Sequence, residues 1–184
     1  MKIYKKIIPS QYVLSIFDID YDKLLKQGIK ALFFDLDNTI IPYDINVIGP
    51  KEQELLEKLS ENFKVLVISN SRKKRVKTAT SNLKNIGYVK FAKKPLKFGF
   101  KKGIKLLNVK KDQVCVIGDQ LMTDILGANR TKIKETILVK PVKQRTDHIL
   151  TRNNRKLENI FIRKVAKKYP EKYNEVLKSY AESK

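Results

Sequence analysis

Four short apolar runs, rich in β-branched and aromatic residues, recur along the chain and restrict its fold more than any other feature. Each run is continuously apolar instead of alternating with polar residues, which is typical of strands buried on both faces of a sheet. Helical patterns fill the segments between the runs, and this alternation predicts an α/β fold with a mainly parallel sheet and helices on both faces. The runs cover residues 31–34, 65–68, 114–117 and 136–139, with a shorter candidate at 88–92.

The segments between the predicted strands carry helix boundaries. Pro50 suits the first turn of a helix expected over 50–62. Ser71 is a candidate N-cap for a second helix, which Gly87 would end. Two further helices are expected over 97–107 and 123–130. Beyond Pro141 the chain turns polar and then resumes a helical pattern with apolar positions at Leu157, Ile160, Phe161 and Val165, which predicts one or two amphipathic C-terminal helices.

Length and charge suggest a single basic domain. With 184 residues, of which 42% are apolar, we expect one domain over 1–184, with a core at about 28–145 and a basic helical segment at about 150–184. The formal net charge of +21 favours phosphate esters, polyanions or anionic lipids as partners. A general lysine bias would give the same composition, so charge alone does not choose a partner. No run approaches the length of a membrane span, and Pro9 interrupts the N-terminal apolar stretch, so we expect a cytoplasmic protein.

Two carboxylates follow the first predicted strand. Asp35 and Asp37 stand at the carboxyl end of that strand, where open α/β folds bind their ligands. In an extended segment the side chains of residues i and i+2 leave on the same side, so the two carboxylates could converge on one reacting group. Their mutual repulsion would be relieved by a bound cation.

The ends of the later strands supply a second set of polar groups. Ser69 and Asn70 follow the second strand and precede a helix N-terminus, a place suited to a phosphoryl group. Lys94 adds positive charge before the next helix. Asp119 and Asp124 follow another strand and offer the hard oxygen ligands that Mg²⁺ prefers.

Taken in order, these residues resemble motifs I to IV of the haloacid dehalogenase (HAD) superfamily over about residues 31–140. More narrowly, the chain resembles the YqeG family of subfamily IIIA phosphatases. This likeness rests on the N-terminal segment 9–20, the Gly28-Ile-Lys lead-in, the segment 118–124 and the segment 127–130. The resemblance implies a three-layer α/β/α, Rossmann-like fold and a phosphoric monoester hydrolase.

The resemblance also implies a mechanism. Asp35 would attack phosphorus and form an aspartyl-phosphate, while Asp37 would protonate the leaving oxygen and then deprotonate water. Mg²⁺ would be held by Asp35, by the backbone carbonyl of Asp37 and by Asp119, with Asp124 either reaching the metal through water or orienting Lys94. The phosphoryl oxygens would be bound by Ser69, the amide of Asn70, and Lys94.

The interval between Asp37 and Ser69 leaves no room for a cap domain, because a loop, a helix and a strand already fill it. A capless site suits a phosphate displayed on something large. The family also resembles mitochondrial phosphatidylglycerophosphate phosphatases, so a lipid phosphate and a peripheral place at the membrane are candidates. The C-terminal apolar stripe would either contact an anionic membrane or pack on the sheet, and we favour packing.

An alternative function belongs to another class. A basic module that binds RNA, ribosomes or membranes could keep the acid cluster only for metal and shape. The retention of Asp37 beside Asp35 favours the enzyme, since a scaffold has no physical need for both. The basic run 72–77 is expected on the outer face of a helix, and His148, the only histidine, is expected to be solvated or hydrogen-bonded.

Overall fold

The computed structural model describes residues 3–142 and 149–183, without the side chains of 149–156; His148 lies outside this range. Within it, six strands form one sheet in the order β1-β6-β5-β2-β3-β4, with every pairing parallel. The four apolar runs are strands as predicted. The strands are β1 (Gln11–Val13), β2 (Ala31–Phe34), β3 (Lys64–Ile68), β4 (Gly87–Val89), β5 (Val114–Gly118) and β6 (Glu135–Val139).

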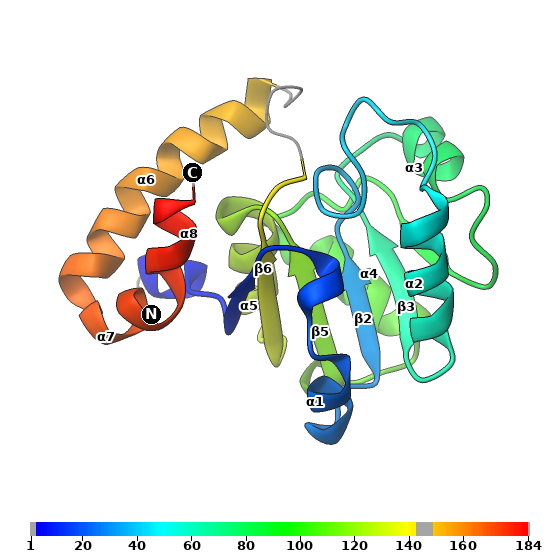
Figure 1. The fold of residues 1–184 in the computed structure, drawn as a ribbon, viewed down its shortest axis with the longest axis horizontal. Helices are drawn as coiled ribbons and strands as arrows, with labels where there is room; N and C mark the ends of the chain where they lie inside the picture. The colour runs from blue at the N-terminus through cyan, green and yellow to red at the C-terminus, as the bar shows by residue number, and fades with distance from the viewer. Residues whose placement is uncertain (1–2, 143–148, 184) are drawn as a thin grey trace.

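Alternate residues of the central strand divide the core between the two faces of the sheet. Leu32 and Phe34 pack in one cluster, and Ala31 and Phe33 pack in another. All four are fully buried, which explains why this run is apolar throughout. Helices α1, α2 and α3 contribute to the first cluster, and α4 and α5 to the second, so helices cover both faces (Figure 1). Their bounds are Tyr21–Lys26, Pro50–Ser60, Lys73–Ala79, Lys97–Leu106 and Leu126–Thr131.

The strand register brings the carboxyl ends of three central strands to one level. Phe34 of β2 pairs with Val67 of β3 on one side and with Ile117 of β5 on the other. Residues that follow these strands therefore leave the sheet at one edge, where open α/β folds bind ligands. Between β2 and β3 the chain forms a loop and α2. Short 3-10 turns cover Ile3–Ile7, Ile16–Asp18 and Lys111–Gln113, and π-helical turns cover Leu121–Ile125 and Tyr173–Leu177.

The C-terminal helices pack beside the edge of the sheet that β1 and β6 form (Figure 1). Ile162 and Val165 of α6 are buried against a cluster that includes Leu138 of β6. Leu157 and Ile160 are 44% and 51% exposed. The predicted stripe is therefore correct at Phe161 and Val165, which pack on this cluster, and wrong at Leu157 and Ile160, whose place on the packed face is taken by Ile162. The helices are α6 (Ile149–Lys168), α7 (Pro170–Lys172) and α8 (Lys178–Glu182).

The helix predicted between Ser71 and Gly87 begins later and ends earlier than expected. Helix α3 begins at Lys73 with Arg72 as its N-cap, and it ends at Ala79. Ser71 does not cap it, because the Ser71 hydroxyl donates to a carboxylate instead. Strand β1 was not predicted, since three partly exposed residues at a sheet edge give no apolar run. Among the described residues, no helix has the length and apolarity to cross a membrane.

Candidate active site

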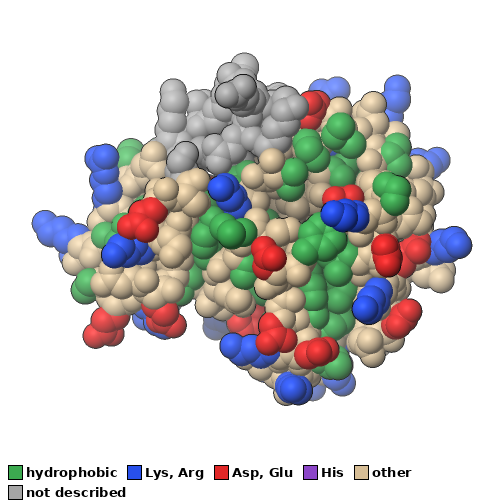
Figure 2. Space-filling model, viewed as in Figure 1, with side chains coloured by type: hydrophobic (Ala, Val, Ile, Leu, Met, Phe, Trp, Pro, Cys, Tyr) green, Lys and Arg blue, Asp and Glu red, His purple; other side chains and the backbone are tan. Residues whose placement is uncertain are grey.

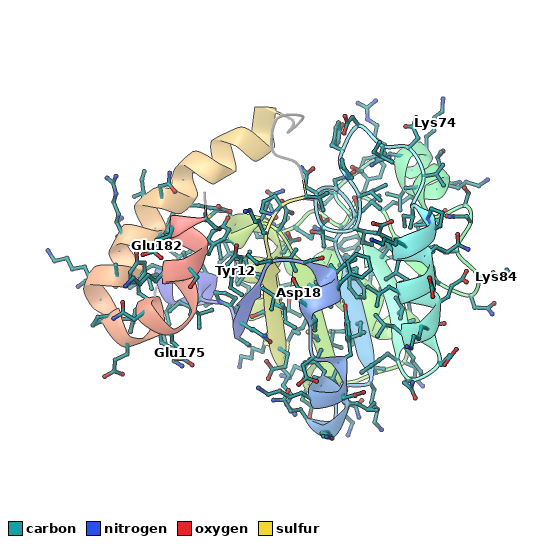
Figure 3. The ribbon with its side chains drawn as sticks, in the orientation of Figure 1. Tyr12, Asp18, Lys74, Lys84, Glu175 and Glu182 are labelled. Atoms are coloured by element: carbon teal, nitrogen blue, oxygen red, sulfur yellow. The ribbon has the colours of Figure 1, made fainter. Side chains whose placement is uncertain are left out.

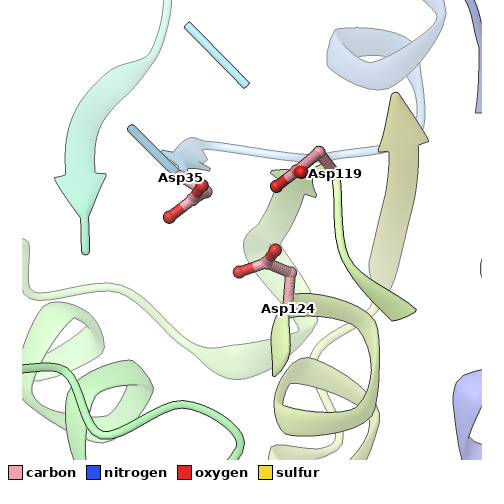
Figure 4. Close-up of side chains that lie close together, drawn as sticks. All are labelled: Asp35, Asp119 and Asp124. Atoms are coloured by element: carbon pink, nitrogen blue, oxygen red, sulfur yellow. The ribbon is translucent and has the colours of Figure 1, made fainter. Parts of the chain in front are cut away.

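Three buried carboxylates meet at the carboxyl edge of the sheet. Asp35 follows β2, Asp119 follows β5, and Asp124 lies in the π-helical turn after β5 (Figure 4). One carboxylate oxygen from each lies within 4.8 Å of the others, and the residues are 6%, 0% and 1% exposed. Buried carboxylates are compensated by positive charge, or they lose their own charge by binding a proton. The cluster therefore favours bound cations.

A glycine allows Asp124 to approach the strand. A Cβ atom placed on Gly118 would lie 2.4 Å from Cγ of Asp124, far inside normal contact. The backbone N–H of Gln120 also donates to Asp124 Oδ2 at 3.2 Å. Gly118, which precedes Asp119, thus makes room for the second carboxylate of the motif, Asp124.

Lys94 supplies one positive charge to this cluster. Its side chain is 2% exposed, and its ammonium contacts Asp35 Oδ1 and, at 2.6 Å, Asp124 Oδ1. The same ammonium donates to the carbonyl oxygen of Ile68 at 3.0 Å. Burial disfavours the charged amine, but Asp124 and Asp35 outweigh this effect and raise the pKa of Lys94 above its usual value. Lys94 is therefore a fixed cation.

The charges at Asp35 remain unbalanced. Burial raises the pKa of Asp35, Lys94 lowers it, and the other carboxylates raise it again, with a net result well above the ordinary value. One ammonium faces three clustered carboxylates, and all the donor atoms are hard oxygens. This donor set fits a divalent cation such as Mg²⁺, with Asp35, Asp119 and Asp124 as the candidate side-chain ligands.

Thr39 lies between two of these carboxylates and was not singled out from the sequence. Its hydroxyl is within hydrogen-bond distance of Asp35 Oδ2 (3.3 Å) and of Asp119 Oδ1 (3.4 Å). Thr39 is 2% exposed. Its position four residues after Asp35, in the same polar segment, was the available signal.

The carboxylate of Asp37 belongs to a separate set of contacts. Ser71 donates to Asp37 Oδ2 at 2.7 Å, and the Ser69 hydroxyl lies 3.5 Å from the same oxygen. Arg75 donates to Asp37 Oδ1 from Nη2 at 2.9 Å and from Nε at 3.1 Å. The expectation that the whole run 72–77 forms an outer face was therefore wrong at Arg75, which turns toward Asp37 from the first turn of α3.

Asn70 contacts Lys94 through the backbone. The side chain of Asn70 accepts from the Lys94 N–H at 2.7 Å and donates to the Lys94 carbonyl oxygen at 3.1 Å. This reciprocal pair joins the segment after β3 to the segment that carries the buried ammonium. The adjacent Lys93 is exposed.

Exposed apolar side chains stand near this edge. They lie on the loop that follows Asp37, on the segment after β4 and in the first turn of α4, and they are 40–57% exposed: Tyr43, Ile45, Val47, Phe91, Leu96 and Phe98. Elsewhere, Figure 2 shows Lys and Arg side chains spread over the visible face with Asp and Glu among them. The described part of that face therefore has no single basic patch.

Residues 1–143 match the model of a family described as mitochondrial PGP phosphatase. A curated relative from Bacillus subtilis (strain 168), named "Probable phosphatase YqeG", is 37% identical over 155 residues, which are 84% of this chain and 88% of the relative.

Two solved structures share the fold. One is an uncharacterised protein from Listeria monocytogenes serotype 4b, with a TM-score of 0.50 and 21% identity over 66% of this chain and 86% of the other. The second is a HAD family enzyme from Bacteroides thetaiotaomicron, solved with magnesium and inorganic phosphate, with a TM-score of 0.50 and 13% identity over 65% of this chain and 98% of the other.

Proposed function

The chain belongs to the mitochondrial PGP phosphatase family, within the HAD superfamily, and is a HAD-type phosphatase; on that premise we propose that it hydrolyses phosphomonoesters through an aspartyl-phosphate on Asp35, with Mg²⁺ as its cofactor. The observation that carries the proposal is the buried group of Asp35, Asp119 and Asp124 around the ammonium of Lys94.

Each residue has a proposed part in the reaction. The Asp35 carboxylate attacks phosphorus as the ester P–O bond breaks, and Asp37 gives its proton to the leaving oxygen. Asp37 then takes a proton from the water that displaces Asp35 from phosphorus. Ser69, the Asn70 amide and Lys94 bind the phosphoryl oxygens, and Asp124 orients Lys94 through the 2.6 Å ion pair.

The proposed cofactor, Mg²⁺, would neutralise negative charge at the site. Asp35, the Asp37 carbonyl and Asp119 would hold Mg²⁺, with Asp124 as a further candidate, and the ion would offset the negative charge of the phosphoryl group. Three clustered carboxylates against one ammonium support a divalent partner.

We infer a phosphate displayed on a large body, such as the lipid phosphatidylglycerophosphate, as the substrate. The support is the short interval between Asp37 and Ser69 together with the exposed apolar side chains near the site. Such side chains would insert at a lipid surface, where the net charge of +21 also favours anionic headgroups. The basic binding module gains no support, because the family and the curated relative are both phosphatases.

The reaction is tested by Mg²⁺-dependent release of phosphate from p-nitrophenyl phosphate. We expect Asp35→Asn to abolish release while its circular dichroism matches wild type. The aspartyl-phosphate is expected as a hydroxylamine-sensitive label on wild type and not on Asp35→Asn. Activity that survives Asp35→Asn, or an inactive wild type with every phosphoester tried, would contradict the proposal.

The substrate class is tested separately. Phosphatidylglycerophosphate in vesicles is compared with soluble sugar phosphates at equal phosphate concentration. We expect preference for the lipid, and we expect Phe98→Ser to reduce turnover of the lipid while leaving p-nitrophenyl phosphate unaffected. Faster turnover of the sugar phosphates would overturn the substrate class and leave the reaction standing.

A further inference from the structure

Arg75 connects the carboxylate of Asp37 to the loop that follows it in the chain. Its Nε and Nη2 both donate to Asp37 Oδ1, at 3.1 and 2.9 Å. Both side chains are 16% exposed, so the ion pair is largely shielded from water. A shielded, doubly hydrogen-bonded pair is stronger and more directional than an exposed one.

The remaining donors of the same guanidinium hold the backbone of that loop. Nη1 donates to the carbonyl oxygens of Ile45 and, at 3.3 Å, of Asn46. Nη2 also lies 3.4 Å from the carbonyl oxygen of Pro42. The guanidinium is thus fixed by groups that do not take part in the reaction, which makes it a rigid support for Asp37. Lysine, with one compact donor group, could not make all these contacts.

The second oxygen of Asp37 is held from the same side. Ser71, which lies two residues before α3, donates to Oδ2 at 2.7 Å, and Arg75 lies in the first turn of the same helix. Asp37 therefore receives hydrogen bonds on both oxygens from one short segment. Its side chain does not belong to the cluster of Asp35, Asp119 and Asp124.

We propose that Arg75 is a positioning residue that holds Asp37 for proton transfer to the leaving group. The inference rests on the proposed function, in which Asp37 gives its proton to the leaving oxygen and becomes a carboxylate. Through its two hydrogen bonds to Oδ1, the guanidinium keeps the Asp37 side chain in place between this proton transfer and the later transfer from the attacking water. The hydrogen bonds of Arg75 go to Asp37 and to the loop carbonyl oxygens, and none goes to Asp35, so Arg75 would act through Asp37.

This role predicts an effect that depends on the leaving group. An alkyl phosphate needs a proton on its leaving oxygen, whereas p-nitrophenolate leaves without one. We expect Arg75→Met to lower kcat/KM for glycerol phosphate by about 10- to 100-fold, within the range of general acid catalysis, and for p-nitrophenyl phosphate by less than about threefold. Arg75→Lys is expected to fall between Arg75→Met and wild type.

Lys74 offers a matched control. It is adjacent to Arg75, is exposed, and points away from the molecule (Figure 3). We expect Lys74→Met, which removes the same charge from the same helix, to leave both values of kcat/KM unchanged. Melting curves for each variant identify loss of folding; if Arg75→Met does not fold, Arg75→Lys carries the comparison.

A second comparison tests whether Arg75 acts through Asp37. In an Asp37→Asn background, adding Arg75→Met is expected to cause no further loss with either substrate. Equal losses with the two phosphates, or an undiminished effect of Arg75→Met beside Asp37→Asn, would overturn the inference. An inactive wild type, or activity that survives Asp35→Asn, would instead overturn the proposed function.

Discussion

Glu158 of α6 accepts a hydrogen bond from the backbone N–H of Leu121 at 2.9 Å. The carboxylate is fully buried, and Tyr180 donates to its other oxygen at 2.8 Å. Leu121 follows Asp119 by two residues and begins the π-helical turn that carries Asp124. The C-terminal helices are thereby attached to the segment that presents two of the three clustered carboxylates.

Removing the Glu158 carboxylate should loosen this attachment. Glu158→Leu removes the acceptor of both buried hydrogen bonds, and we expect a loss of about 2–3 kcal/mol in the free energy of unfolding. Urea denaturation measures the loss. Glu182→Leu, a substitution at an exposed position of α8 (Figure 3), should change stability by less than about 0.5 kcal/mol. Equal stability of the two variants would show that the buried carboxylate contributes nothing.

Asp35→Asn should stabilise the protein when divalent cations are chelated. The raised pKa of Asp35 means that the unfolded chain loses this proton near pH 4, at about the ordinary value, while the folded protein keeps it. The free energy of unfolding then falls as the pH rises from about 4 to the pKa of Asp35 in the folded protein. Asparagine removes this effect, and Lys94 keeps its ion pair with Asp124.

We expect Asp35→Asn to melt about 2–4 °C above wild type in EDTA at neutral pH, corresponding to about 1 kcal/mol for a chain of this size. Added Mg²⁺ should raise the melting temperature of wild type more than that of the variant, because the variant lacks the Asp35 carboxylate, a proposed ligand of the ion in the folded state. The exposed Asp18 (Figure 3) provides the control, and Asp18→Asn should behave as wild type. A variant that melts below wild type in EDTA would refute the argument.

Lys94→Met should destabilise the protein, in contrast to Asp35→Asn. The substitution removes the cation that the buried carboxyl groups of Asp35 and Asp124 share, and we expect a cost of about 3–5 kcal/mol in EDTA. Mg²⁺ should restore part of this loss by replacing the missing charge. Lys93→Met, at the exposed neighbour, should cost little. Thermal melts with and without Mg²⁺ would separate the variants, and equal melting temperatures would contradict a role for Lys94 in charge balance.

The central strands and the order of the motifs that follow them were predictable, because a strand buried on both faces requires a continuous run of apolar residues. Those strand ends carry Asp35, Ser69 and Asp119, so their common edge followed from the parallel sheet. Edge strand β1 and the early end of α3 were not predictable. Strand β1 consists of three partly exposed residues and has no distinctive pattern. The apolar residues after Ala79 pack on the core although α3 has ended, so their spacing does not show where the helix ends.

The support around the site was harder to predict than the site. Arg75 stands in a run of basic residues, and nothing in that run distinguishes the one basic side chain that contacts Asp37. Glu158 gave no signal either, since a lone Glu in a basic helix is ordinarily solvated. Both contacts join segments distant in the chain, and only the tertiary arrangement reveals them.

Gly118 allows a final prediction, because its missing side chain makes room for Asp124. In Gly118→Ala the new Cβ would lie 2.4 Å from Asp124 Cγ, which must move and take its oxygen away from Lys94. We expect an overpacking cost of about 1–3 kcal/mol and a loss of phosphatase activity of at least about tenfold. Gly87→Ala is the control, since its Cβ would meet Leu66 at 3.5 Å, an ordinary contact. Assays and melts of both variants decide the matter: an active, stable Gly118→Ala would mean that Asp124 need not sit where it does.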